Sequence, residues 1–290
     1  MGKISTTTIF LTAAALALLV FFGSFAVLPF GGKPVVVFSA PTLRGISDEL
    51  AEKSSKSVDV QVHGSVFAAN LIRSGRVPDL FLSVDSELKA GLNYRKERLI
   101  GIYRLVLVCT KVHKGIEALK TAKIGIADPN IAPVGYRALA AIYMISEKEN
   151  LGVIDEVERS LNIKYVREQP NSIRLVAVNI APSGRFYMRP NLDVVGSLLE
   201  AGTVDCIFAH SPFVITRNLD KEYNVIELPD YSRFENNPPL EIYAELSTGV
   251  IKIVRLEAIA LSFSEEGDKL IQLIDEIDVS KYGIKRVEST

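Results

Sequence analysis

The 290-residue sequence contains no tryptophan, only two cysteines and three histidines, and almost no net charge. Its 33 basic residues are balanced by 34 acidic ones. The chain therefore lacks the basic field with which proteins attract nucleic acid, and we expect no nucleic-acid partner. Internal repeats and low-complexity tracts are also missing. The length suffices for one large domain or two smaller ones with hydrophobic cores.

The two cysteines indicate no metal site. Cys109 and Cys206 each lie in an apolar, strand-like run and match no metal-binding spacing. We expect two buried free thiols. A disulfide between them is an alternative that the sequence does not require.

Motifs of enzymatic catalysis are missing as well. The loops described below contain no nucleophile elbow, phosphate-binding loop, His-x-x-x-His pair or paired carboxylate motif. We therefore expect a binding protein rather than an enzyme.

One long hydrophobic run is present near the N-terminus. Ile9–Phe30 carries no charge and is long enough to span a hydrocarbon core of about 30 Å. An uncleaved anchor is the favoured interpretation, and a cleaved signal ending near Ala26 is the alternative. No cysteine follows the run, which excludes a bacterial-style lipoprotein anchor. Residues 1–33 are thus predicted to be a membrane anchor or signal segment with a linker. The rest of the chain is expected outside the cytoplasm, anchored or secreted, because Lys3 is the only early charge.

The folded body begins with an alternation of strands and helices. Apolar strands are predicted at Val35–Phe38, Val58–Val62 and Leu80–Val84, and helices from about Leu43 to Lys53 and from Ser65 onward. This rhythm is typical of a parallel sheet covered by helices, with ligand-binding loops at the carboxyl ends of the strands.

The same rhythm restarts after a predicted strand at Leu105–Thr110. Helices are predicted near 113–120, 135–148 and 153–161 and at Leu192–Ala201, and strands at 124–127, within Arg174–Met188 and at Val204–Phe208. An extended run at Ile251–Ser262 and a helix at Glu265–Ile277 close the chain. We predict an α/β protein with a first lobe of residues 34–104 and 250–290 and a second lobe of residues 105–249. A cleft at such a junction commonly holds a small ligand.

A short segment of the second lobe has the features of an anion site. The strand at 124–127 runs into Asp128-Pro129-Asn130, and Pro133 suits the first turn of the following helix. The amide N–H groups and the positive dipole end of such a helix bind anions.

Three other loops repeat this arrangement of hydroxyls or free amides before a helix. The four loops are Ser39–Thr42, His63–Val66, Ala132–Tyr136 and Ala209–Ser211. Two belong to each lobe, so an oxyanion between the lobes would receive donors from both sides and bridge them. A hydrogen bond to a charged group contributes about 1.5–3 kcal/mol, and nanomolar binding needs about 12 kcal/mol. Six or seven neutral donors are therefore sufficient.

Several motifs occur in the order found in one known family. They are Phe38–Leu43, Gly64–Val66, Asp128–Asn130 with Pro133–Arg137, Arg189-Pro190 leading into Leu198–Gly202, and Ile226–Pro229. Between about Val35 and Phe263 the chain resembles the archaeal tungstate/molybdate-binding proteins of ABC importers. The resemblance implies a two-lobed type II periplasmic-binding-protein fold, each lobe a mainly parallel sheet flanked by helices.

The resemblance also implies a ligand, partners and binding residues. It implies extracytoplasmic capture of tungstate or molybdate and delivery to an ABC permease with its ATPase, without a cofactor. By position, Thr42 and Ser65 would donate hydroxyls, and Val134 and neighbouring amides would complete the second lobe. The predicted ligand-binding set is Thr42, Ser65, Val134, Tyr136, Ala209 and His210. We expect a monomer.

The sequence departs from the family at two positions. Carboxylates that can reach the metal centre in the family are replaced by Ala132 and Ala209. We therefore expect no direct metal coordination but a tetrahedral oxyanion held by hydrogen bonds. Sulfate or another small anion is an alternative ligand, and a membrane-tethered sensor is an alternative function.

Three charged or chargeable side chains near these loops have two interpretations each. One or both of His63 and His210 could be protonated and add positive charge, or each could be a rim histidine or a histidine bonded to backbone. Arg137 could contact the ligand, but a structural pair with a carboxylate such as Asp128 is favoured.

Overall fold

The first lobe is built on a five-stranded sheet in the order β2-β1-β3-β14-β4. The valine-rich β1 (Val35–Ser39) pairs in parallel with β2 (Val58–Val62) and β3 (Leu80–Ser83). The antiparallel β14 (Glu257–Ser262) and β4 (Lys96–Ile102) complete the sheet. Its helical elements are η1 (Pro41–Leu43), α2 (Arg44–Lys53), α3 (Ser65–Arg73), η2 (Ser86–Lys89), α9 (Glu265–Ile274) and η4 (Val279–Tyr282).

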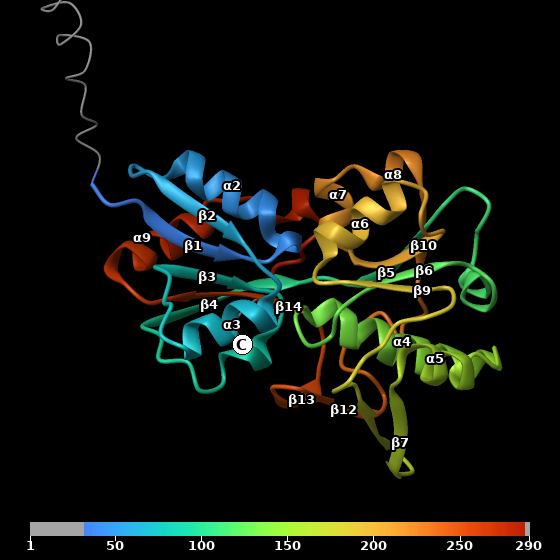
Figure 1. The fold of residues 1–290 in the computed structure, drawn as a ribbon. Coiled ribbons are helices and arrows are strands. Elements are labelled where there is room, and N and C mark those ends of the chain that lie inside the picture. The colour runs from blue at the N-terminus through green and yellow to red at the C-terminus, as the bar shows by residue number, and fades with distance from the viewer. Residues whose placement is uncertain (1–31, 288–290) are drawn as a thin grey trace, which may run out of the picture. The chain divides into compact units, whose positions relative to one another are not determined.

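The second lobe contains two sheets. The first has the order β11-β5-β10-β6-β9, made of Asn224–Glu227, Leu105–Cys109, Cys206–His210, Ile124–Ala127 and Phe186–Arg189. The second has the order β13-β12-β8-β7, made of Gly249–Ile253, Glu241–Leu246, Ser172–Val176 and Lys164–Gln169. Its helical elements are η3 (Ile116–Lys120), α4 (Pro133–Glu149), α5 (Ile154–Leu161), α6 (Leu192–Glu200), α7 (Ser211–Thr216) and α8 (Leu219–Glu222). Figure 1 shows β7, β12 and β13 projecting below the larger sheet.

Two segments connect the lobes. The first joins β4 to β5 through Tyr103 and Arg104, and the second joins β13 to β14 through residues 254–256. The Tyr103 amide donates a 3.4 Å hydrogen bond to the Leu256 carbonyl, so the two connections touch. Because β13 pairs with β12, the chain returns to the first lobe after Ile253, a few residues beyond the expected boundary.

Most predicted elements are found near their expected positions. The helix expected near 113–120 is the short 3-10 helix η3, and the extended run at Ile251–Ser262 is divided between β13 and β14. The edge strands β4, β7 and β11 and the short helices α7 and α8 have no clear period in the sequence. The interior strand β12 does alternate between buried and more exposed residues, although no strand is predicted there from the sequence.

The cysteines are joined by a disulfide, so the expectation of two free thiols is wrong. Cys109 in β5 is the register partner of Cys206 in the antiparallel β10, and their Cα atoms are 4.1 Å apart. Register across strands separated by 97 residues decides this contact.

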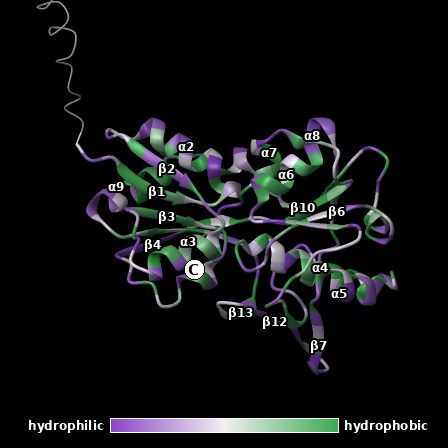
Figure 2. Ribbon diagram, viewed as in Figure 1, coloured by the Kyte–Doolittle hydropathy of each residue, from purple (hydrophilic) through white to green (hydrophobic). Residues whose placement is uncertain are grey.

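The computed structural model describes residues 32–287. Figure 2 shows the hydrophobic residues concentrated in the strands and inner helix faces, with hydrophilic residues on the outer surfaces. The predicted anchor at Ile9–Phe30 lies outside the described residues. Within the described range, no helix combines the length and apolarity needed to cross a bilayer.

Candidate functional site

The four loops predicted from the sequence form two pairs. Each pair consists of one loop from the first lobe and one from the second. The amide of Phe67 in the first turn of α3 donates a 3.1 Å hydrogen bond to the Ile131 carbonyl, just before α4. Gly64, which precedes α3, lies so close to Ile131 that a Cβ atom built on it would be 2.5 Å from the same carbonyl oxygen. The first pair is therefore His63–Val66 with Ala132–Tyr136.

The second pair is formed by a side-chain hydrogen bond. Thr42 Oγ1 and His210 Nδ1 are 2.9 Å apart, and both residues are buried. Thr42 lies in η1 after β1, and His210 ends β10 immediately before α7. Each of the two contacts thus joins a strand end of the first lobe to one of the second.

The Thr42–His210 pair leaves one donor over. A neutral histidine and a threonine carry two polar hydrogens, and the bond between them uses one of them. The other hydrogen is on Thr42 Oγ1 or on His210 Nε2, depending on the tautomer. His210 Nε2 has no partner within residues 32–287, and the Thr42 hydroxyl has only this one contact. Each tautomer therefore leaves a buried donor without an acceptor, which costs about 1–3 kcal/mol.

Ser65 offers further donors. Its Oγ accepts a 3.2 Å hydrogen bond from the Val84 amide, so the hydroxyl hydrogen remains for another acceptor. Ser65 and Val134 lie at the starts of α3 and α4, where backbone amides have no intrahelical partner. The donors available to a ligand are therefore neutral hydroxyl, imidazole and amide groups.

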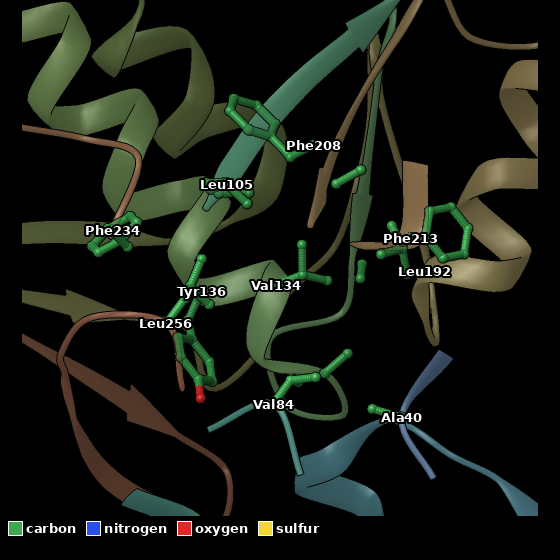
Figure 3. Packing of buried hydrophobic residues seen from close by; sticks show 14 of the residues in the cluster. Ala40, Val84, Leu105, Val134, Tyr136, Leu192, Phe208, Phe213, Phe234 and Leu256 are labelled. Atoms are coloured by element: carbon green, nitrogen blue, oxygen red, sulfur yellow. The ribbon is translucent and has the colours of Figure 1, made fainter. Parts of the chain in front are cut away.

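A fully buried ion pair lies between the lobes beside these donors. Asp85, which follows β3, is 2.9 Å from Arg137 Nη1 in α4, and both side chains have no exposed surface. The Tyr136 hydroxyl donates to the same carboxylate. Figure 3 shows Tyr136 extending from α4 toward the segment that carries Val84. The favoured interpretation of Arg137 as the partner of a carboxylate is confirmed, but the carboxylate is that of Asp85 rather than of Asp128.

The true partner was not visible because Asp85 is 52 residues away in sequence and in the other lobe. Asp128 instead accepts hydrogen bonds from the amide and side chain of Asn130 and shapes the turn before α4. Asp85 could have been found by applying the strand-end rule to β3, because Val84 and Asp85 directly follow that strand, which pairs in parallel with β1.

Burial and charge fix the ionisation states in this cluster. Burial, followed by the nearby Arg137, lowers the pKa of His210 well below its ordinary value of 6.5. Burial and then Arg76 lower the pKa of His63. Burial alone would lower the pKa of Arg137, but Asp85 and Tyr136 outweigh it and raise this pKa, so the guanidinium stays charged. The low pKa favours a neutral imidazole at His210, against the hypothesis that this histidine adds positive charge to the site.

We expect the free energy of unfolding to fall as the pH drops below about 6.5. The unfolded chain takes up a proton on His210 near pH 6.5, whereas the folded protein does so only at lower pH. Stability is therefore retained above this pH and declines below it, by at most about 1.4 kcal/mol for each pH unit. Urea denaturation at pH 7.5, 6.5 and 5.5 measures this.

Two variants identify the source of the effect. On acidification the His210→Gln variant should lose less stability than the unchanged protein. His113 lies outside the site, so the His113→Gln variant should lose as much stability as the unchanged protein. An equal pH slope in His210→Gln and the unchanged protein contradicts the assignment.

The other predicted residues have different surroundings. Val134 is buried in the first turn of α4, and Ala209 is buried inside β10 opposite Val106. His63 packs edge-on against Phe38 and Phe67 rather than lying with His210. In the part of the chain that the structure describes, no group of three or more His, Cys, Asp or Glu side chains could hold a metal ion.

Comparisons with known proteins agree with this architecture. A model of the family described as bacterial extracellular solute-binding protein matches residues 35–252. A search of curated proteins finds no match.

Three solved structures from bacteria have a similar fold. The periplasmic molybdate-binding protein of Azotobacter vinelandii superposes with a TM-score of 0.61 at 14% identity, over 88% of this chain and 100% of that chain. The substrate-binding domain of a putative molybdenum ABC transporter from Clostridium difficile gives 0.50 at 14% identity, over 88% and 99%. The bromide-bound regulatory domain of HypT from Salmonella typhimurium gives 0.52 at 11% identity, over 88% and 100%. These likenesses establish the fold predicted from the sequence, a two-lobed type II periplasmic-binding-protein fold.

Proposed function

The chain belongs to the bacterial extracellular solute-binding protein family, and on this premise we propose that it captures a tetrahedral oxyanion between its lobes. Tungstate or molybdate is the proposed ligand. Family membership implies an extracytoplasmic solute-binding protein. Proteins of this kind are generally not enzymes. The choice of oxyanion depends on the chemistry of the site. It is supported by the fold shared with a protein whose name states that it binds molybdate.

The observation that carries the proposal is the unpaired donor of the Thr42–His210 pair. Both residues are buried, they belong to different lobes, and one polar hydrogen lacks an acceptor in either tautomer. An anion that accepts this hydrogen removes the cost of the buried unpaired donor, and it does so beside a hydrogen bond that joins the two lobes. The unpaired hydrogen of the Thr42–His210 pair thus supports the binding of an oxyanion, which supplies the missing acceptor.

The remaining donors complete the proposed ligand shell. We assign the hydroxyl of Ser65 and the first-turn amides near Ser65 and Val134 to the ligand, with the backbone near Ala209. The Tyr136 hydroxyl is bound to Asp85, so we assign Tyr136 a supporting role. Because all proposed donors are neutral, the site would select among oxyanions by size and protonation state.

The proposal includes delivery to an ABC permease with its ATPase, from a monomer held outside the cytoplasm by the N-terminal segment. The Cys109–Cys206 disulfide supports this location, since disulfides persist in oxidising compartments. We propose residues 34–104 and 254–290 as the first lobe and residues 105–253 as the second, which differs from the sequence-based limit at 249/250 only by placing β13 in the second lobe.

The proposal is tested by calorimetric titration with tungstate, molybdate, sulfate and phosphate. The protein used lacks residues 1–31 and retains the compact unit Val35–Thr290. We expect a dissociation constant of about 1 μM or below for tungstate or molybdate, and values at least tenfold higher for sulfate and phosphate. If none of the four anions produced heat or raised the melting temperature, the proposed function would be abandoned.

Thr42→Val serves as the matched variant in this titration. Valine has nearly the same shape but removes the hydroxyl from the pair, so we expect at least tenfold weaker binding. Thr110→Val, a similar change at the end of β5 and away from the site, should leave the affinity within twofold. Equal affinities of Thr42→Val and the unchanged protein contradict the assigned site.

A further inference from the structure

The buried Asp85–Arg137 pair has no role in the ligand shell just described, although it is the only buried ion pair found in residues 32–287. Asp85 is held firmly in the first lobe. Its Oδ1 accepts from the Glu87 amide at 3.0 Å, and its own amide donates to Ser83 Oγ. Only Oδ2 is turned to the second lobe, where it accepts from Tyr136 and Arg137.

The partners of Asp85 belong to the same helical turn as the proposed ligand donors. Tyr136 and Arg137 follow Val134 in α4. In the first lobe, Val84 precedes Asp85 in the chain, and its amide donates a hydrogen bond to Ser65 Oγ. A displacement of Asp85 relative to α4 therefore changes the distance between the donors of the two lobes.

Both connections between the lobes also contact this cluster. Arg137 Nη2 donates to the Val254 carbonyl at 3.3 Å, and the Tyr103 hydroxyl donates to the Val84 carbonyl at 2.8 Å. Tyr103 and Val254 lie in the two connecting segments. The ion pair is thus positioned beside the segments about which the lobes can rotate.

We propose that Asp85, Tyr136 and Arg137 form a latch between the lobes that sets the closed geometry in which the ligand is bound. Asp85 is a positioning residue, since both its oxygens are occupied by protein donors. This inference rests on the proposed function. In the closed form each charge is buried and needs the other, whereas in an open form water solvates both. Removing one charge therefore disfavours closure, and removing both relieves that penalty.

The test is a double-mutant cycle with Asp85→Asn, Arg137→Gln and both together, titrated with molybdate. Each single variant should bind at least tenfold more weakly than the unchanged protein, because binding requires the closed state. The double variant should bind within about threefold, since Asn and Gln can form a neutral hydrogen bond. A single variant with unchanged or tighter binding overturns the latch, and so does a double variant no better than the weaker single one.

Lobe separation gives a readout independent of the ligand. Spin labels at Glu52→Cys and Lys120→Cys, one on an exposed residue of each lobe, report the distance between the lobes without molybdate. We expect longer or broader distances in the single variants and recovery in the double variant. If the unchanged protein bound none of the four anions, the proposed function would be contradicted but the latch would not. The distances between the lobes would still test the latch, and equal distances in every variant would contradict it.

An exposed ion pair between the lobes provides the control. Arg44 Nη2 and Asp193 Oδ2 are 3.5 Å apart, the first side chain is exposed and the second partly exposed, and Asp193 also pairs with Arg217 of its own lobe. Solvent-accessible pairs of this kind contribute little. Asp193→Asn should therefore change affinity less than twofold. If Asp85→Asn does not fold, as judged by circular dichroism, Tyr136→Phe replaces it. That variant keeps the charge pair, loses one hydrogen bond, and should bind about three- to tenfold more weakly; unchanged binding overturns the proposal.

Discussion

Gly64→Ala is expected to weaken oxyanion binding by about a hundredfold while the protein remains folded. The added Cβ would be 2.5 Å from the Ile131 carbonyl oxygen of the other lobe, against ordinary contacts of 3.4–4 Å. The lobes must therefore stay nearly 1 Å farther apart. A hydrogen bond of 2.9 Å, such as that between Thr42 and His210, does not survive that displacement.

The magnitude follows from the contacts that closure provides. A ligand held mainly by one lobe loses at least two hydrogen bonds to the other, each worth about 1.5–3 kcal/mol. Two such bonds correspond to at least about a hundredfold in affinity. Gly64 has an extended backbone, with φ −61° and ψ 138°, so alanine adds no backbone strain. Calorimetry with molybdate measures the affinity, and thermal unfolding measures stability.

Two other glycines make the comparison specific. Gly135→Ala places a Cβ 2.2 Å from the Ala127 carbonyl oxygen within the second lobe, so it should lower the melting temperature as well as the affinity. Gly115→Ala meets only the flexible end of Glu117 and should change neither. If Gly64→Ala bound as tightly as Gly115→Ala, the lobes would not close through Gly64 and Ile131.

Loss of the Cys109–Cys206 disulfide is expected to lower the free energy of unfolding by about 3–5 kcal/mol. The bond closes a loop with a sequence separation of 97 residues, and a loop of about 100 residues corresponds to about 4.7 kcal/mol in the chain-entropy model. The measured quantity is the urea midpoint of the protein with and without a reducing agent strong enough to cleave a buried bond.

A double variant separates bond loss from side effects of the reductant. Cys109→Ala with Cys206→Ala should unfold at the midpoint of the reduced protein and should not respond to reductant. Affinity for molybdate should change little, because both cysteines are at the end of their strands away from His210. Equal midpoints of oxidised and reduced protein contradict a stabilising disulfide.

The elements were largely predictable because their signals are local. The valine run of β1, the alternation in β2 and the apolar face of α9 each specify one element from neighbouring residues. Edge strands such as β4 and β7 escaped prediction, because their exposed side chains give no clear alternation of apolar and polar residues.

The candidate site was predictable to the level of loops. Strand ends followed by helix starts indicated that Thr42, Ser65, Val134 and His210 face one ligand region, and contacts across the lobes support that grouping. The partners within the site were not predictable. Asp85 and Arg137 are too far apart in sequence for any local pattern to pair them.

The sequence by itself therefore determined the order of the central strands and the longer helices, the α/β class and the loops at the strand ends. Each depends on residues within one or two turns of each other. Only the tertiary structure decided that the cysteines are bonded, that the pKa of His210 is lowered, and that Arg137 pairs with Asp85. These properties depend on strand register and on burial between lobes, which arise only when segments 50 to 170 residues apart are packed together.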